Sequence, residues 1–147
     1  MPEIDNPLVA FRFGLEIENK LTGYFTNVSG IGSENEVIDH KIVAPTGETI
    51  IQKIPGRLTW TEVTLKRGVT ANIDVWKWRH MVVTGKVKSA RTNCSIVAYD
   101  QEMKEIARWN FVAAWPSKVT GPEMDSGGTA YLVEEMTIVH EGMERVS

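Results

Sequence analysis

The sequence predicts a mainly β protein: two packed antiparallel sheets that form a barrel-like sandwich, with one α-helix. Apolar and polar residues alternate with a period of two in several segments, turn residues separate these segments, and only one stretch has helical periodicity. A chain of 147 residues can bury a core as one domain. We therefore expect residues 1–147 to form a single domain.

Five strands are expected between residues 11 and 99. Residues 11–18 alternate apolar and polar side chains, which is typical of a strand with one buried face. Extended runs follow at about 24–29 and 34–42. Segments 57–67 and 92–99 are rich in β-branched residues, with Trp60 in the first and Tyr99 in the second, and predict two more strands.

The C-terminal third predicts two further strands. Residues 104–115 alternate again, and Pro116 is expected to end that strand. Pro122 and the pair Gly127-Gly128 indicate a loop. The last predicted strand covers residues 130–140.

Residues 43–55 predict a long loop, because two prolines and a glycine interrupt them. The segment still carries Ile50, Ile51 and Ile54. Apolar side chains in a long loop need a cover, and a partner chain is one candidate.

One helix is predicted over about 72–84, with Thr70 or Asn72 as its cap. At 100° per residue it has two apolar stripes, whereas a surface helix normally has one. The first stripe is Ile73, Trp76, His80 and Val83, and the second is Val75, Trp78 and Val82. Two interpretations of Trp78 stay open: contact with a neighbouring subunit, or cover by its own chain.

Charge and composition argue against several function classes. The formal net charge of −3 and a pI of about 5.6 do not suit a constitutive nucleic-acid binder. The single Cys94 allows no intrachain disulfide and fits folding in a reducing compartment. The first residues lack the pattern of a signal peptide, and the apolar runs are too short to span a bilayer. We expect cytoplasmic synthesis and no membrane insertion of the monomer.

No constellation of residues predicts catalysis. His40, His80 and His140 lack metal-ligand spacing, and Glu134 and Glu135 are adjacent in a strand and so point to opposite faces. We expect no catalytic, cofactor or metal site, and no enzymatic activity.

Short motifs spread along the chain carry a family resemblance. They are Phe11-Arg12-Phe13 with Glu16-Ile17, Gly23-Tyr24-Phe25 leading into Val28-Ser29-Gly30-Ile31, Glu34 with Glu36-Val37-Ile38, Lys53-Ile54-Pro55-Gly56, Thr64-Leu65-Lys66-Arg67-Gly68-Val69-Thr70, Trp76 with Trp78, Arg108-Trp109, Ala114-Trp115-Pro116 with Lys118, Gly121-Pro122, and His140-Glu141-Gly142-Met143. In their order and spacing they resemble the tail-tube proteins of contractile phage tails and related bacterial injection systems. Residues 43–51 lack the Gly-rich character expected there, and the turn at 100–104 lacks its usual glycine.

The resemblance implies a structural protein. Hexameric rings would join their strands into one barrel around a channel and stack into a tube. A contractile sheath would surround the tube, and a baseplate and spike would sit at its tip. Sheath contraction would drive the tube through a target envelope, with protein effector or DNA cargo in the lumen, so the protein would be found in a phage tail or an extracellular or cell-anchored particle.

The resemblance also gives roles to the apolar residues singled out above. Ile50, Ile51 and Ile54 would contact a neighbouring subunit or the next ring. Trp76 and Trp78 would brace the helix, one against the barrel and one at an interface. Two alternatives remain: a baseplate tube-initiator of the same fold, and a monomeric ligand-binding β-barrel.

Overall fold

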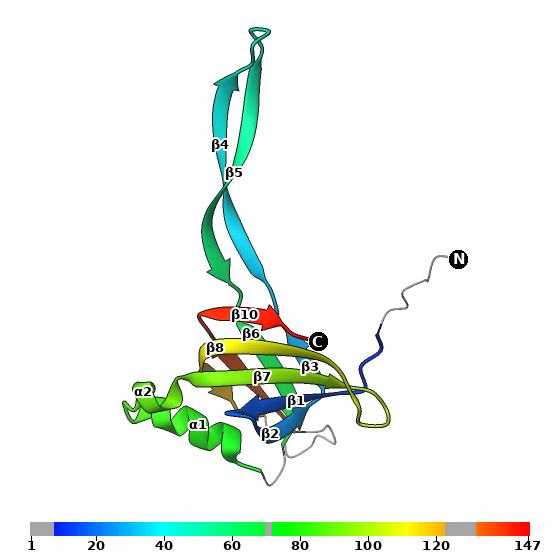
Figure 1. Ribbon diagram of the computed structural model, residues 1–147. Coiled ribbons are helices and arrows are strands. Elements are labelled where there is room, and N and C mark those ends of the chain that lie inside the picture. Colours follow the sequence, from blue (N-terminus) through cyan, green and yellow to red (C-terminus); the bar gives the residue numbers. More distant parts are fainter. Residues whose placement is uncertain (1–7, 70–71, 123–131) are drawn as a thin grey trace, which may run out of the picture.

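The computed structural model describes residues 8–69, 72–122 and 132–147, and shows a compact body from which a long hairpin projects (Figure 1). The elements are β1 (Arg12–Ile17), β2 (Lys20–Phe25), β3 (Asn27–Ser29), β4 (Ser33–Val43), β5 (Thr49–Trp60), β6 (Val63–Gly68), α1 (Asp74–Val83), α2 (Val87–Ala90), β7 (Thr92–Tyr99), β8 (Glu105–Thr120), β9 (Val133–Val139) and β10 (Gly142–Arg145). The first residues of the chain, the proposed cap Thr70, the Gly127-Gly128 turn and the start of the last predicted strand lie outside the described residues.

The body is an antiparallel sheet folded over on itself, and the predicted fold class is confirmed. Its strands follow the order β2-β1-β7-β8-β9-β6-β3, and β10 pairs with residues 109–112 of β8. In Figure 1, β6 and β9 lie behind β7 and β8, and α1 and α2 lie at one end. The path is open between β2 and β3, so the layers form a sandwich and not a closed barrel.

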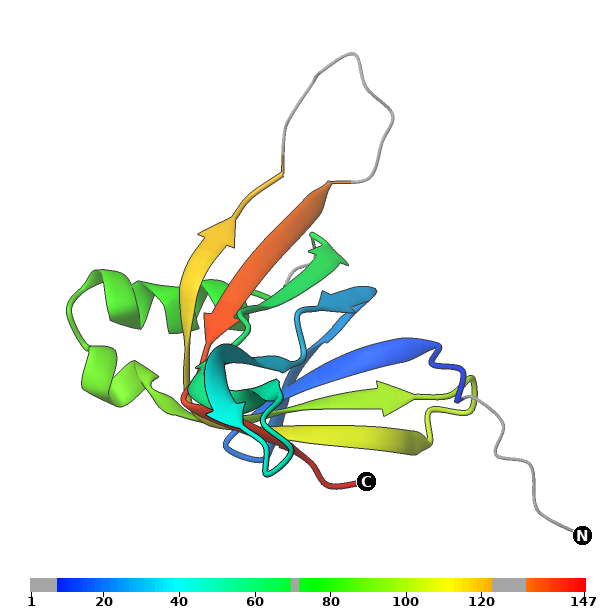
Figure 2. The same ribbon diagram turned by 90° about the horizontal axis from the view of Figure 1, so that it is seen from above.

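Strand β8 connects the two layers. Residues 105–114 pair with β7, and residues 115–120 pair with β9. Between these parts the buried positions shift from Ala107 and Phe111 to Ala114 and Pro116, because the strand is irregular near Ala113, which has a φ of 49°. The crossing lets one strand contribute to both layers of the core (Figure 2).

Pro116 was predicted to end this strand, and that prediction is wrong. The strand continues to Thr120, with a register shift between Pro116 and Lys118. Proline is tolerated where no partner needs its missing N–H. Here α1 covers that edge, and Arg79 Nη1 donates to the Pro116 carbonyl at 3.0 Å.

The core takes side chains from both layers and from the helices. Its buried members are Leu15, Phe25, Val63, Leu65, Val75, Trp78, Ala90, Cys94, Ile96, Phe111, Ala114, Met136 and Ile138. The alternation seen in the sequence places these residues inward from successive strands. The sandwich is therefore held mainly by apolar burial between β1, β7 and β8 on one side and β6 and β9 on the other.

The predicted loop over 43–55 is wrong. β4 and β5 pair along their length, from Val43 opposite Thr49 to Ser33 opposite Trp60. The proline and glycine signals mark only a tight turn, in which Gly47 has a φ of 88° and donates its N–H to the Ala44 carbonyl. Pro55 fits within β5 because, among the described residues, β5 pairs with β4 alone.

Smaller differences concern element boundaries. The predicted strand at 24–29 is divided into the end of β2 and β3, and the strand at 57–67 is interrupted between β5 and β6. The helix prediction is confirmed, and Asn72, one of its two proposed caps, accepts the N–H of Asp74 at 2.9 Å through Oδ1. The elements α2 and β10 were not predicted. The turn at 100–104 forms without glycine because Asp100 Oδ1 accepts from the N–H groups of Glu102 and Lys104, while Met103 takes a φ of 61°.

Candidate assembly surface

The β4–β5 hairpin has almost no support from its own chain. Every side chain of β4 and most of those of β5 are exposed, and the two strands pair only with each other among the described residues. A two-stranded ribbon is marginally stable in water and needs a further packing partner. The hairpin is therefore the part of the molecule that most needs a cover.

The strand register gives the hairpin two different faces. Ile38 lies opposite Ile54, and Ile42 lies opposite Ile50. Because side chains alternate along a strand, these four residues share one face, which we call the isoleucine face. The isoleucine face is interrupted only by the pair His40 and Gln52.

The other face, which we call the charged face, carries ionic groups. Asp39 lies opposite Lys53, and the Lys53 ammonium donates to the Asp39 carboxylate at 2.6 Å. Lys41 lies opposite Ile51. An exposed pair of this kind contributes little to stability. Val37 and Val43 are exposed on the same face.

The isoleucines expected to act together are therefore divided between the faces. Ile50 and Ile54 share the isoleucine face, whereas Ile51 points to the charged face. Ile38 and Ile42 belong with the first two and were not singled out. Their spacing of four in a predicted strand was the available signal, but only the strand pairing shows that all four meet. Their role at an interface remains a prediction.

The two helix stripes have different surroundings. Val75 and Trp78 are buried, and Trp78 is 5% exposed and donates its indole N–H to the Ala90 carbonyl at 2.8 Å. Trp78 is therefore covered by its own chain, in part by α2. The other stripe is open: Ile73, Trp76 and Val83 are exposed, Trp76 by 37%. Of the two tryptophans, only Trp76 offers surface to a partner, and its interface role remains a prediction.

A buried ion pair holds Trp76 in place. Arg67 on β6 and Glu134 on β9 are 3% and 4% exposed, and Arg67 Nε donates to Glu134 Oε1 at 2.5 Å. The second oxygen of Glu134 accepts from the indole N–H of Trp76 at 2.7 Å. Arg67 also donates to the Asn72 carbonyl at 3.1 Å, so the pair connects α1 to both strands.

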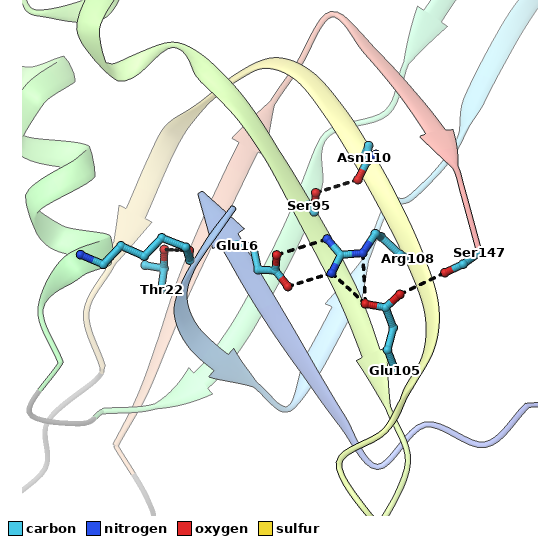
Figure 3. A network of polar contacts seen from close by, with 8 residues as sticks. Glu16, Thr22, Ser95, Glu105, Arg108, Asn110 and Ser147 are labelled. Atoms are coloured by element: carbon cyan, nitrogen blue, oxygen red, sulfur yellow. Dashed lines mark hydrogen bonds and ion pairs between the residues drawn. The ribbon is translucent and has the colours of Figure 1, made fainter. Parts of the chain in front are cut away.

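A network of polar contacts lies on the outer side of β1, β7 and β8 (Figure 3). The Arg108 guanidinium donates to both carboxylate oxygens of Glu16, at 3.2 and 3.0 Å, and to Glu105 Oε1 at 2.7 Å. These hydrogen bonds raise the pKa of Arg108, and the bond to Glu105 has the largest effect. The bond between Arg108 and Glu105 also lowers the pKa of Glu105. Ser95 donates to Asn110 at 2.7 Å beside this network.

A shallow cavity of about 580 Å³ lies on the same side. Its lining includes Asn93, Cys94, Asn110 and Glu144. Burial raises the pKa of the Cys94 thiol to about 12, so the sulfur is not a thiolate nucleophile at neutral pH. His40, His80 and His140 form no cluster, and the described ranges contain no group of acidic, histidine and cysteine side chains suited to a metal ion.

The isoleucine face and the open stripe of α1 suit contact with another protein. Both surfaces are apolar and lack a partner within the described structure, while the β1–β7–β8 side carries the polar network of Figure 3. None of the helices in the described segments is both long and apolar enough to cross a membrane.

The family model described as T4-like virus tail tube protein gp19 matches residues 9–144 of the chain. That match spans nearly the whole sequence and includes every described helix and every described strand, except for Arg145, the last residue of β10. No curated protein matches the chain in sequence.

Solved structures with the same fold come from contractile injection systems. The chain from the PVC sheath-tube complex in the extended state of an extracellular contractile injection system has 20% identity and a TM-score of 0.79, over 98% of this chain and 94% of that chain. The chain from the anti-feeding prophage tube-terminating cap has 19% identity and a TM-score of 0.80, over 100% and 95%. The chain from the 6-fold symmetrised anti-feeding prophage baseplate has 18% identity and a TM-score of 0.75, over 97% of each chain.

Proposed function

The chain belongs to the T4-like virus tail tube protein gp19 family, and from this we propose that it is the main inner-tube subunit of a contractile, phage-tail-like injection system. Six copies form a ring, and rings stack into a hollow tube. The observation that carries the proposal is a projecting hairpin with an apolar face that its own chain leaves uncovered, in a chain that matches a tube family over residues 9–144.

The hairpin supplies the contact between subunits. A ring closes through a heterologous interface, in which one patch of each subunit meets a different patch of its neighbour. The isoleucine face of the hairpin is one such patch, and it contacts a neighbouring subunit or the next ring. Burial of the exposed parts of Ile38, Ile42 and Ile50 stabilises the contact by roughly 25 cal/mol per Å² of apolar surface.

The open stripe of α1 supplies a second contact. Trp76 is fixed by its hydrogen bond to the buried Glu134 carboxylate, so little conformational entropy is lost when a partner covers it. Fixed aromatic side chains of this type commonly dominate the binding energy of protein interfaces. The stripe is therefore available to a subunit or to a protein outside the tube.

The polar side of β1, β7 and β8 suits the channel wall. It can remain in water, which the two apolar surfaces cannot do without cost. Glu16 and Glu105 outnumber Arg108 in the network, so DNA or protein effector would pass without strong adsorption to basic groups.

The partners follow from this role: a contractile sheath around the tube, and a baseplate with a spike at its tip. The likeness in fold to a chain of a PVC sheath-tube complex supports the first. The protein would be made in the bacterial cytoplasm and would act in an assembled tail or injection particle.

A tube-initiator in the baseplate is the second candidate, because a chain of the anti-feeding prophage baseplate shares the fold with a TM-score of 0.75. The copy number separates the two roles. Quantitative mass spectrometry of purified particles should give about as many tube subunits as sheath subunits for a main tube protein, and only a few copies per particle for an initiator.

Light scattering and negative-stain electron microscopy of the purified chain at rising concentration test the proposal. Six-fold rings or hollow tubes are the expected result. A chain that stays monomeric, even with its baseplate proteins present as a nucleus, contradicts it.

A further inference from the structure

His140 lies where the hairpin joins the body. It follows β9, and its ring centroid is 4.8 Å from that of Phe111 on β8, with an angle of 70° between the rings. On its other side Trp60, the last residue of β5, has its centroid 5.7 Å away, at 53°. The imidazole is therefore packed between a strand of the body and the strand that leaves the hairpin.

The surroundings of His140 favour the neutral imidazole. Both ring nitrogens are buried, and neither makes a hydrogen bond of good geometry with the described residues. Burial, the largest effect, lowers the pKa of His140, and contacts with the backbone of Thr61 and Gly142 oppose this only in part.

The elements around His140 provide no compensating charge. Trp60 and Phe111 are uncharged; the acidic residue nearest to Trp60 along the chain is Glu62, and the one nearest to His140 is Glu141. Within the described part of the chain, no carboxylate is among the causes that shift the pKa of His140. A proton on this ring would therefore be a buried charge without a counterion, which is costly unless the site opens to water.

We propose that neutral His140 is a latch that clamps the root of the β4–β5 hairpin, and that its protonation in mild acid releases the hairpin from the body. β4 and β5 pair with no other described strand, so packing at their root sets the direction of the hairpin. The clamp acts fully above the unfolded-state pKa of about 6.5 and is lost as the pH falls through the lower folded-state pKa. This inference concerns the single chain and does not depend on the proposed function.

A distance measurement in the unassembled full-length chain tests the latch. Spin labels go on Thr49→Cys near the hairpin tip and on Gln101→Cys in the body, both exposed positions. Cys94 can stay, because its buried thiol has a pKa of about 12 and is unreactive. We expect a narrow distance distribution at about pH 7.5 and a broad one at about pH 5.

His140→Phe is the matched variant, since it keeps an aromatic ring but cannot be protonated. It should give a narrow distribution at both pH values, while His40→Gln, on the exposed hairpin, should behave like the original protein. Equal broadening in His140→Phe, or unfolding of the whole body at about pH 5 by circular dichroism, overturns the proposal.

Imidazole NMR of the unsubstituted protein provides a test that does not depend on the variant folding. His140 should titrate with a pKa below the ordinary imidazole value of about 6.5, and the distance distribution should broaden over the same pH range. Protonation of His140 without any change in the distance distribution would overturn the latch.

Discussion

Replacing Ile50 by aspartate should prevent assembly without unfolding the subunit. Ile50 lies on the isoleucine face and is 45% exposed in the single chain. Full burial of an isoleucine stabilises by about 1.5–3 kcal/mol, so covering the exposed part contributes about 1 kcal/mol. A carboxylate enclosed in the same contact costs a few kcal/mol more. The sum of about 3 kcal/mol corresponds to about a 100-fold weaker association.

The assay is the concentration at which rings or tubes first appear, measured by light scattering and sedimentation velocity. Thr49→Asp is the matched control, because Thr49 is exposed, adjacent and on the opposite side of the strand. Ile51→Asp, on the charged face, should have a smaller effect than Ile50→Asp. Denaturant unfolding of all three variants should differ from the original protein by about 0.5 kcal/mol or less, as is usual for exposed positions.

The comparison between the variants decides the outcome. If Ile50→Asp and Thr49→Asp shift the assembly concentration equally, the isoleucine face does not form the contact. If Ile51→Asp has the larger effect, the opposite face does, and the assignment of the two faces must be reversed.

Three further predictions test the structure around this surface. Glu134→Ala should lower the free energy of unfolding, measured by denaturant titration, by about 3–5 kcal/mol, because it leaves a buried arginine without its partner. Glu135→Ala, which removes an exposed pair, should lower it by less than about 1 kcal/mol. Trp78→Ala should lower the free energy of unfolding of the monomer by about 3–5 kcal/mol, because Trp78 is buried. Trp76→Ala should lower it less and should weaken assembly more. Equal effects of the two substitutions in both assays would contradict the roles given to these residues. Gly30→Ala should lower the thermal midpoint by several degrees, since Gly30 has a φ of 84° and an added methyl group would collide with a backbone carbonyl; an unchanged midpoint would show that this turn can adjust.

Local patterns were sufficient for most of the fold. The alternation in β1 and in the first part of β8 depends on neighbouring residues, as does the content of β-branched residues in β7, so the sequence predicts those strands directly. The helix was also predictable, because Val75 and Trp78 repeat at helical spacing. Prediction from local patterns failed where an element depends on distant contacts. An example is Pro116, whose strand continues because α1 covers its edge.

The hairpin shows how composition can mislead. Two prolines and a glycine in residues 43–55 indicated a loop, but only the turn around Gly47 uses them in that way. Pro55 is accepted because no described strand pairs with the second edge of β5, and this depends on the sheet topology and not on the local sequence.

The candidate surface was predictable only in part. Ile50 and Ile54 could be singled out as apolar residues without a cover, but their grouping with Ile38 depends on strand register. The ion pair that fixes Trp76 joins Arg67 to Glu134, 67 residues apart, and no local pattern relates them.

A cryo-electron microscopy reconstruction of the particle formed by the chain tests the central claim most directly. The account predicts a hollow six-fold tube in which the isoleucine face of each hairpin is buried against another subunit and the β1–β7–β8 side lines the channel. A tube with that hairpin face in solvent would contradict the proposed contact, and a particle whose tube contains no copy of this chain would contradict the function itself.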